Sequence, residues 1–194
     1  MKVDFTSSAL IVVDVQNDFC PGGALEVEGV DEVIEPLNRL ASLFGANSGR
    51  VIATQDWHPK EHVSFTIWPS HCVQGTTGAD FHKGLDLKPV NLIVRKGFRV
   101  NIDSYSAFFE NDRETSTGLD GFLKALSINT LVLGGLATDY CVLYSALDAI
   151  KLGYKTIIAA DAIRAVNNPA GSAEQAFGLF NKAGITIIDS KEIK

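Results

Sequence analysis

Short, uninterrupted apolar runs alternate along this sequence with longer segments that carry apolar residues at helical spacing. A run without polar interruptions is typical of a strand that is covered on both faces, as in a parallel sheet between helices. The pattern therefore predicts an α/β fold, a three-layer, doubly wound and mainly parallel six-stranded sheet with helices on both faces. The predicted strands are residues 9–13, 50–54, 91–95, 130–133, 155–160 and 185–188. The predicted helices are residues 30–44, 119–126, 139–152 and 171–183.

The length and composition indicate the class of protein. We expect a single domain over residues 1–194, because 46% hydrophobic and 21% charged residues are ordinary globular values. The net charge of -6 does not attract nucleic acid or an anionic membrane. The N-terminus lacks the features of a signal peptide, and three cysteines are too few for a disulfide framework. We therefore expect a soluble, cytoplasmic protein, as a monomer or a homo-oligomer.

Polar residues follow several of the predicted strands at the point where each strand ends. Ligands of an open parallel sheet bind beyond the carboxyl ends of the strands, so these residues are candidates for a site. They are Asp14, Asp56, Lys96 and Asp161. A long irregular region, residues 57–89, follows the second strand, and a loop of that length in a compact domain is usually functional.

Asp14 and Lys96 are candidates for acid–base chemistry. Partial burial would raise the pKa of the Asp14 carboxyl toward values useful in proton transfer. Lys96 could pair with Asp14 and with an anionic nucleophile at the same edge. The alternatives are a turn-capping aspartate and an exposed lysine, and the exposed lysine is the commoner situation.

Cys141 is a candidate nucleophile. The glycine pair at 134–135 turns the chain after the fourth strand, and Thr138 is a plausible N-cap that would place Cys141 in the first helical turn. The helix dipole and free N–H groups there would lower the pKa of the thiol and could bind an oxyanion. The alternative is a small buried helix residue. The position at the ligand edge favours the nucleophile.

The segment after the second strand contains a candidate metal site. Asp56, His58 and His71 provide one carboxylate and two imidazoles, which suit zinc, iron or manganese and leave open coordination positions. The alternative is a set of surface histidines. All four histidines of the chain lie between residues 58 and 82, and this clustering favours a metal site.

Taken together, these segments resemble the nicotinamidase/pyrazinamidase branch of the isochorismatase-like cysteine hydrolases. The matching segments occur in the family's order, and the resemblance extends from residue 10 to about residue 165. The aspartate, lysine and cysteine segments mark the superfamily, whereas the metal segments distinguish nicotinamidases. The segments are residues 14–19, 56–59, 68–73, 96–97 and 135–142.

The resemblance implies the isochorismatase-like hydrolase fold and a role for each matching residue. The implied catalytic triad is Asp14, Lys96 and Cys141. The implied ligands of one divalent metal ion are Asp56, His58 and His71, with His62 in second rank. Zinc is the first expectation for that ion, with iron or manganese as the alternatives. The implied oxyanion donors are the N–H groups of Ala137 and Cys141, after a cis peptide between Leu136 and Ala137. The implied substrate-binding residues are Phe19, Trp68, Tyr105, Leu136 and Ala137.

The activity that the resemblance implies is hydrolysis of nicotinamide, and of pyrazinamide, to the acid and ammonia through a cysteine thioester, in NAD salvage. One alternative is another small-amide or carbamoyl amidohydrolase of the same superfamily. A second alternative is a non-catalytic metal-binding or ligand-binding scaffold, because a fold alone does not define a function. Cys20 and Cys72 are assigned no role.

Overall fold

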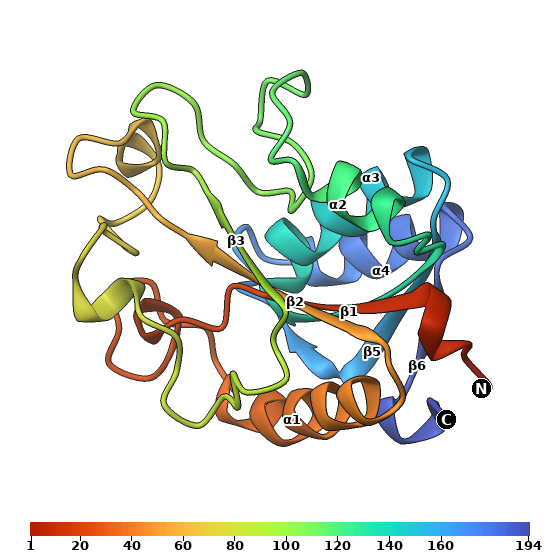
Figure 1. The fold of residues 1–194 in the computed structure, drawn as a ribbon. Coiled ribbons are helices and arrows are strands. Elements are labelled where there is room, and N and C mark those ends of the chain that lie inside the picture. Colours follow the sequence, from red (N-terminus) through yellow and green to blue (C-terminus); the bar gives the residue numbers. More distant parts are fainter.

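One sheet of six parallel strands lies between helices in the computed structural model, which describes residues 1–194 (Figure 1). The strands are β1 (Ser8–Val13), β2 (Arg50–Asp56), β3 (Leu92–Lys96), β4 (Thr130–Leu136), β5 (Lys155–Arg164) and β6 (Thr186–Ile188). The helices are α1 (Asp31–Ala46), α2 (Leu119–Ala125), α3 (Leu143–Lys151) and α4 (Ser172–Lys182). The strand order is β3-β2-β1-β4-β5-β6, so the predicted doubly wound α/β fold is confirmed.

Helices cover both faces of the sheet, with α1 on one side and α2, α3 and α4 on the other (Figure 1). Successive residues of a strand point to opposite faces, so β1 contributes to two apolar cores. Leu10 packs in the core under α1, and Ile11 packs in the core under α2, α3 and α4. All six residues of β1 are buried, which explains its uninterrupted apolar sequence. None of the helices combines the length and the apolar character needed to span a bilayer.

The strand β4 extends through its two glycines to Leu136, beyond the predicted end at residue 133. Glycine usually weakens a strand, which is why the sequence pattern ended there. Gly135 has a φ of 115°, and a Cβ on it would lie 2.1 Å from the carbonyl oxygen of Val13. The glycine therefore lets β4 approach the end of β1 closely, directly before the turn that carries Cys141.

The predicted helix over residues 139–152 is divided into two parts. Residues Thr138–Val142 form a π-helical turn, and the α-helix α3 begins at Leu143. The N–H of Val142 donates to the carbonyl of Ala137, five residues earlier, and Ala137 rather than Thr138 is the N-cap. The prediction of a Thr138 cap is therefore wrong, because the Thr138 side chain makes no capping bond to this turn.

Two irregular segments continue from the carboxyl ends of β2 and β3. The first, residues 57–91, contains the predicted functional loop, and the second is residues 97–118. Backbone and side-chain hydrogen bonds join them: the Val63 N–H donates to the carbonyl of Val100, and His62 Nε2 lies 3.1 Å from the carbonyl of Ile102. These bonds hold the two segments together where residues 62–63 meet residues 100–102.

Candidate active site

The sheet changes winding direction between β1 and β4, and a crevice at that point is where ligands bind in folds of this type. Asp14 directly follows β1, and Cys141 lies in the turn after β4. Asp56 and Lys96 are the last residues of β2 and β3. Segments far apart in the sequence therefore bring four chemically active side chains to one edge.

The structure brings Asp14, Lys96 and Cys141 together. The Nζ of Lys96 lies 2.8 Å from the Oδ2 of Asp14 and 3.5 Å from the Sγ of Cys141. The Asp14 carboxylate and the Cys141 sulfur lie within 4.8 Å of one another. Lys96 is fully buried, so the alternative of an exposed lysine does not apply. A buried ammonium that touches both a carboxylate and a thiol can stabilise either one as an anion.

Burial controls the proton affinities in this cluster. Burial raises the pKa of the Asp14 carboxyl and of the Cys141 thiol, and the Lys96 ammonium opposes both increases. The expectation of a lowered thiol pKa is therefore wrong for this structure. The thiol is held neutral, and its deprotonation needs an adjacent base. Burial would lower the pKa of Lys96, but Asp14 and Asp56 raise it well above its usual range.

Thr54, on β2, fixes the Asp14 carboxylate through a pair of reciprocal hydrogen bonds. Its hydroxyl donates to the Oδ1 of Asp14 at 2.6 Å and accepts from the Asp14 N–H at 3.1 Å. Asp14 itself adopts a φ of 48°, which turns the chain away from the sheet. Thr54 could not be predicted from the sequence because it lies inside an apolar strand, and only the pairing of β1 with β2 places it beside Asp14.

Asp56, His58 and His71 form a set of ligand atoms that lie within 4.8 Å of one another. The Nδ1 of His58 donates to the carbonyl of Gly97 at 2.8 Å, and the Nδ1 of His71 donates to the carbonyl of Pro69 at 2.7 Å. These bonds leave Nε2 of each imidazole free for a metal, which is the usual arrangement of ligating histidines. The Nε2 of His58 is buried and has no hydrogen-bond partner. The residues present therefore fit a divalent metal ion.

Gly97 explains how His58 reaches this position. Its φ is 62°, in the region that favours glycine, and a Cβ on it would lie 2.5 Å from Cε1 of His58. The residue after Lys96 therefore has to be glycine for the imidazole to rest against the backbone.

Electrostatics link the metal ligands to the triad. Lys96 also forms an ion pair with Asp56. Burial opposes ionisation of Asp56, but Lys96 and His58 together lower the pKa of this carboxyl. Asp56 is thus an anion that interacts with the lysine and with both histidines. A metal ion bound to Asp56 would therefore interact electrostatically with Lys96.

His62 and Asp103 lie beside His58, with ligand atoms within 4.8 Å of one another. Both ring nitrogens of His62 are occupied, since Nδ1 accepts from the Ser64 N–H and Nε2 donates to the carbonyl of Ile102. His62 therefore orders the loop in this structure. Asp103 lines the cavity described next, and the sequence analysis did not select it because residues 97–118 carry no periodic pattern.

A mainly apolar cavity lies between the metal ligands and Cys141. Phe19, Trp68, Tyr105 and Ala137 line it, whereas Leu136 does not and instead packs in a neighbouring apolar cluster. The indole N–H of Trp68 donates to the Tyr105 hydroxyl at 3.1 Å. Further lining residues that the sequence analysis did not select are Leu25, Ser64, Asp103, Tyr140 and Val166. Its apolar and aromatic lining is suited to binding a small aromatic ring.

The turn before Cys141 has the expected backbone. The peptide between Leu136 and Ala137 is cis. The Ala137 N–H donates to no group of the protein, while its carbonyl accepts from the N–H groups of Tyr140 and Val142. A free N–H beside the nucleophile is available to an anionic oxygen.

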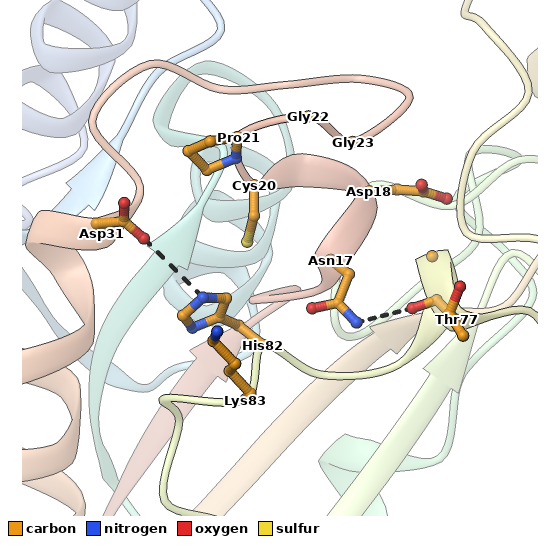
Figure 2. A pocket seen from close by; sticks show the side chains of 11 residues that line it. Asn17, Asp18, Cys20, Pro21, Gly22, Gly23, Asp31, Thr77, His82 and Lys83 are labelled. Carbon is orange, nitrogen blue, oxygen red and sulfur yellow. Dashed lines mark hydrogen bonds and ion pairs between the residues drawn. The ribbon is translucent and has the colours of Figure 1, made fainter.

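A second, polar depression is lined by Asn17 and Asp18 (Figure 2). The next residue, Phe19, lines the first cavity instead. The polar groups of the depression pair with one another, as in the ion pair of 3.9 Å between His82 and Asp31. Cys20 is buried beside it, and burial together with Asp31 raises the pKa of its thiol to about 11.

Two further polar or thiol-bearing residues lie outside the cavity. Cys72 is buried and free, and burial raises the pKa of its thiol. Asp161 accepts hydrogen bonds from the N–H and the hydroxyl of Ser190, at 2.7 and 2.6 Å, so its carboxylate binds the segment near the C-terminus. Neither residue belongs to the candidate site.

Comparisons with known proteins agree with this geometry. The family model that matches the chain describes the isochorismatase domain and spans residues 8–192. A nicotinamidase of Acinetobacter baylyi is 45% identical over 205 residues, which cover 95% of this chain and 94% of the relative. The structure of PnC1 from L. infantum in complex with nicotinate has a TM-score of 0.94 at 36% identity and covers 100% of this chain and 98% of its own. A pyrazinamidase of Pyrococcus horikoshii in complex with zinc has a TM-score of 0.86 at 36% identity, with 94% and 99% coverage.

The chain therefore belongs to the isochorismatase-domain family. Its class is that of an amidohydrolase enzyme, and within the family it groups with the nicotinamidases. The resemblance inferred from the sequence motifs is confirmed. The alternative of a non-catalytic scaffold does not agree with these relatives.

Proposed function

We propose that this protein hydrolyses nicotinamide to nicotinate and ammonia through a thioester on Cys141, in NAD salvage. The observation that carries the proposal is the buried Lys96, whose ammonium contacts Asp14, Asp56 and Cys141 at once. One lysine thereby joins a base and a nucleophile to a set of metal ligands. Nicotinamide has a reactive amide at one end and a pyridine nitrogen at the other, so it matches both parts of the site.

The cavity would hold the substrate between the two parts. Phe19 and Trp68 line the cavity and would flank the ring, and Tyr105 supports Trp68 by accepting a hydrogen bond from its indole N–H. Asp56, His58 and His71 would hold one divalent ion, with zinc first and iron or manganese as the alternatives. When bound, that ion would supply a Lewis-acid position for the pyridine nitrogen of the substrate, which would help to orient the amide toward Cys141.

Acylation begins with transfer of the thiol proton. Asp14 takes the proton of Cys141, and Lys96 stabilises the thiolate that results. The sulfur attacks the amide carbon, and the oxygen becomes an anion that accepts from the N–H groups of Ala137 and Cys141. Asp14 then gives its proton to the amide nitrogen, the C–N bond breaks, and ammonia leaves. The raised pKa of Asp14 suits a group that has to accept and return a proton.

Deacylation uses the same residues in reverse. Asp14 takes a proton from a water molecule, whose oxygen attacks the thioester carbon. The C–S bond breaks, and the sulfur leaves as a thiolate beside Lys96. The product is nicotinic acid, which keeps the second proton of the water and releases it to solvent to become nicotinate. The thiolate recovers its proton from Asp14, which restores the resting pair.

The experiment that tests this proposal measures ammonia release from nicotinamide, pyrazinamide and a panel of small aliphatic amides and carbamoyl compounds. The expected result is a kcat/KM for nicotinamide well above that for the non-aromatic amides. A preference for an aliphatic or carbamoyl substrate would contradict the proposal and favour another amidohydrolase of the superfamily.

Elemental analysis of the same purified protein tests the metal assignment. We expect about one divalent ion per chain, loss of nicotinamide turnover on chelation, and recovery on metal addition. Turnover that is unchanged after complete metal removal would contradict the role given to Asp56, His58 and His71.

A further inference from the structure

The loop between β5 and α4 contributes to the substrate cavity. Val166 lines the cavity together with Tyr140 and Cys141 of the turn after β4, whereas residues 168–170 of the same loop are exposed to solvent. A short loop with an exposed tip needs fixed contacts at its base if one of its side chains is to form a wall.

Asp139, two residues before Cys141, provides such contacts. Its side chain is buried, and its carboxylate accepts hydrogen bonds from the N–H of Val166 at 3.0 Å, the N–H of Asn167 at 2.8 Å and the hydroxyl of Ser172 at 2.5 Å. All three donors belong to the loop or to the first residue of α4. Hydrogen bonds to an ionised carboxylate are stronger than those between neutral groups.

The next residue fastens the same loop. The hydroxyl of Tyr140 donates to the carbonyl of Asn168, and Tyr140 also lines the cavity. The π-helical turn therefore carries the nucleophile and, one and two residues earlier, the two anchors of the cavity wall. Because the anchors and the nucleophile belong to one short turn, the position of the cavity wall is fixed relative to Cys141.

We propose that Asp139 is a positioning residue that holds Val166 as a wall of the substrate cavity and so sets the affinity for the substrate. The inference rests on the proposed function for the identity of the substrate. Asp139 touches no reacting atom, so it acts through the loop. Its carboxylate has no hydrogen-bond partner outside the loop and α4 among its side-chain contacts.

The variant Asp139→Asn preserves the shape of the side chain but replaces one acceptor oxygen with an NH₂ group that faces donors. We call the loop closed when Val166 is held against the cavity by Asp139. If only about a tenth of the Asp139→Asn molecules have the closed loop, the apparent affinity for substrate falls about tenfold. The bound complex still contains the closed loop, so kcat stays within about threefold. A role in overall folding alone would instead lower the active fraction, and hence kcat, at constant KM.

The experiment measures kcat and KM for nicotinamide, and the inhibition constant of nicotinate, in the wild type, Asp139→Asn, Ser172→Ala and the double variant. We expect KM and the inhibition constant to rise together in Asp139→Asn, and to rise less in Ser172→Ala. We expect little further effect of Ser172→Ala in the Asp139→Asn background, since one bond is lost only once. Asp161→Asn is the matched control, because Asp161 also accepts from a backbone N–H and a serine hydroxyl, but of Ser190. It should leave KM unchanged.

Hydrogen exchange of residues 165–172 and alkylation of Cys141 by iodoacetamide provide readouts that need no substrate. Both should be faster in Asp139→Asn and unchanged in Asp161→Asn. A fall in kcat at constant KM, or exchange of the loop at the wild-type rate, would overturn the proposal. Absence of nicotinamide turnover in the wild type would refute the proposed function instead, and the exchange rates would still decide whether Asp139 holds the loop.

Discussion

At the scale of single residues, Lys96 is the centre of the candidate site. Its ammonium contacts two carboxylates, one thiol and the carbonyl of Ser104, which accepts at 2.9 Å. Burying an unpaired charge is costly, whereas this lysine is paired on every side. Its neighbours come from the end of β1, from β2, from the segment after β3 and from the turn after β4, so no local sequence pattern could have predicted its burial.

The variant Lys96→Met should abolish nicotinamide turnover and lower the free energy of unfolding. It leaves two buried carboxylates facing each other, so we expect a loss of about 3–5 kcal/mol in the free energy of unfolding and loss of nicotinamide turnover. Lys124→Met is the control, because the Lys124–Asp120 ion pair is an exposed i,i+4 pair that contributes about 0.5 kcal/mol. Denaturant unfolding and an ammonia assay measure both effects. A Lys96→Met protein as active as the wild type would contradict the assignment.

The variant Thr54→Val should change the pH dependence of the reaction. The Thr54 hydroxyl stabilises ionised Asp14, so its removal raises the pKa of that carboxyl further. Asp14 accepts a proton only when ionised, and the rate falls as the pH drops through its pKa. The acid limb of the kcat/KM profile should therefore move to higher pH. Thr156→Val, a buried strand threonine that donates to the Tyr154 carbonyl, should leave the limb in place. An unmoved limb, or one at lower pH, in Thr54→Val would count against Asp14 as the base.

At the scale of elements, Gly97, directly after β3, and Gly135, near the end of β4, allow close approaches at the candidate site. The loop conformation at Gly97 places His58, and Gly135 brings β4 against β1. Both glycines have a positive φ, and a Cβ at either position would overlap a neighbouring group, so another residue would be strained there.

Gly97→Ala should weaken metal binding specifically. The added Cβ would overlap the His58 ring, so the imidazole must move away from the carbonyl that fixes it. Gly184→Ala is the matched control, because Gly184 also has a positive φ, 72°, but a Cβ there meets nothing within 4 Å. Both variants should lose about 1–2 kcal/mol of stability from backbone strain, and only Gly97→Ala should lose metal affinity in competition with a chelator. Equal metal affinities would refute this role of Gly97.

The sequence allowed the elements to be predicted better than the details of the site. Continuous apolar runs predicted β1 and β2 because the strands are buried on both faces. The π-helical turn was not predicted, since Thr138 has the chemistry of an N-cap and only tertiary packing shows that Ala137 occupies that position. Asp103 and Asp139 were missed because their roles depend on contacts between loops that are distant in sequence.

At the scale of the whole molecule, β1 connects the two apolar cores. We propose that residues 1–194 fold as a single domain, because the same strand contributes Leu10 to one core and Ile11 to the other. Leu10→Ala and Ile11→Ala should each lower the free energy of unfolding by about 2–5 kcal/mol and shift one shared thermal transition. Calorimetry measures this. Two separate transitions, each sensitive to one variant only, would indicate two independent units.

The most direct test of the account is ammonia release from nicotinamide by Cys141→Ala beside the wild type, at equal protein and metal content. We expect no turnover above the buffer control in Cys141→Ala, with the thermal transition and the bound metal retained. Full amidase activity in Cys141→Ala would contradict the role of Cys141, because the reaction would then proceed without the proposed nucleophile.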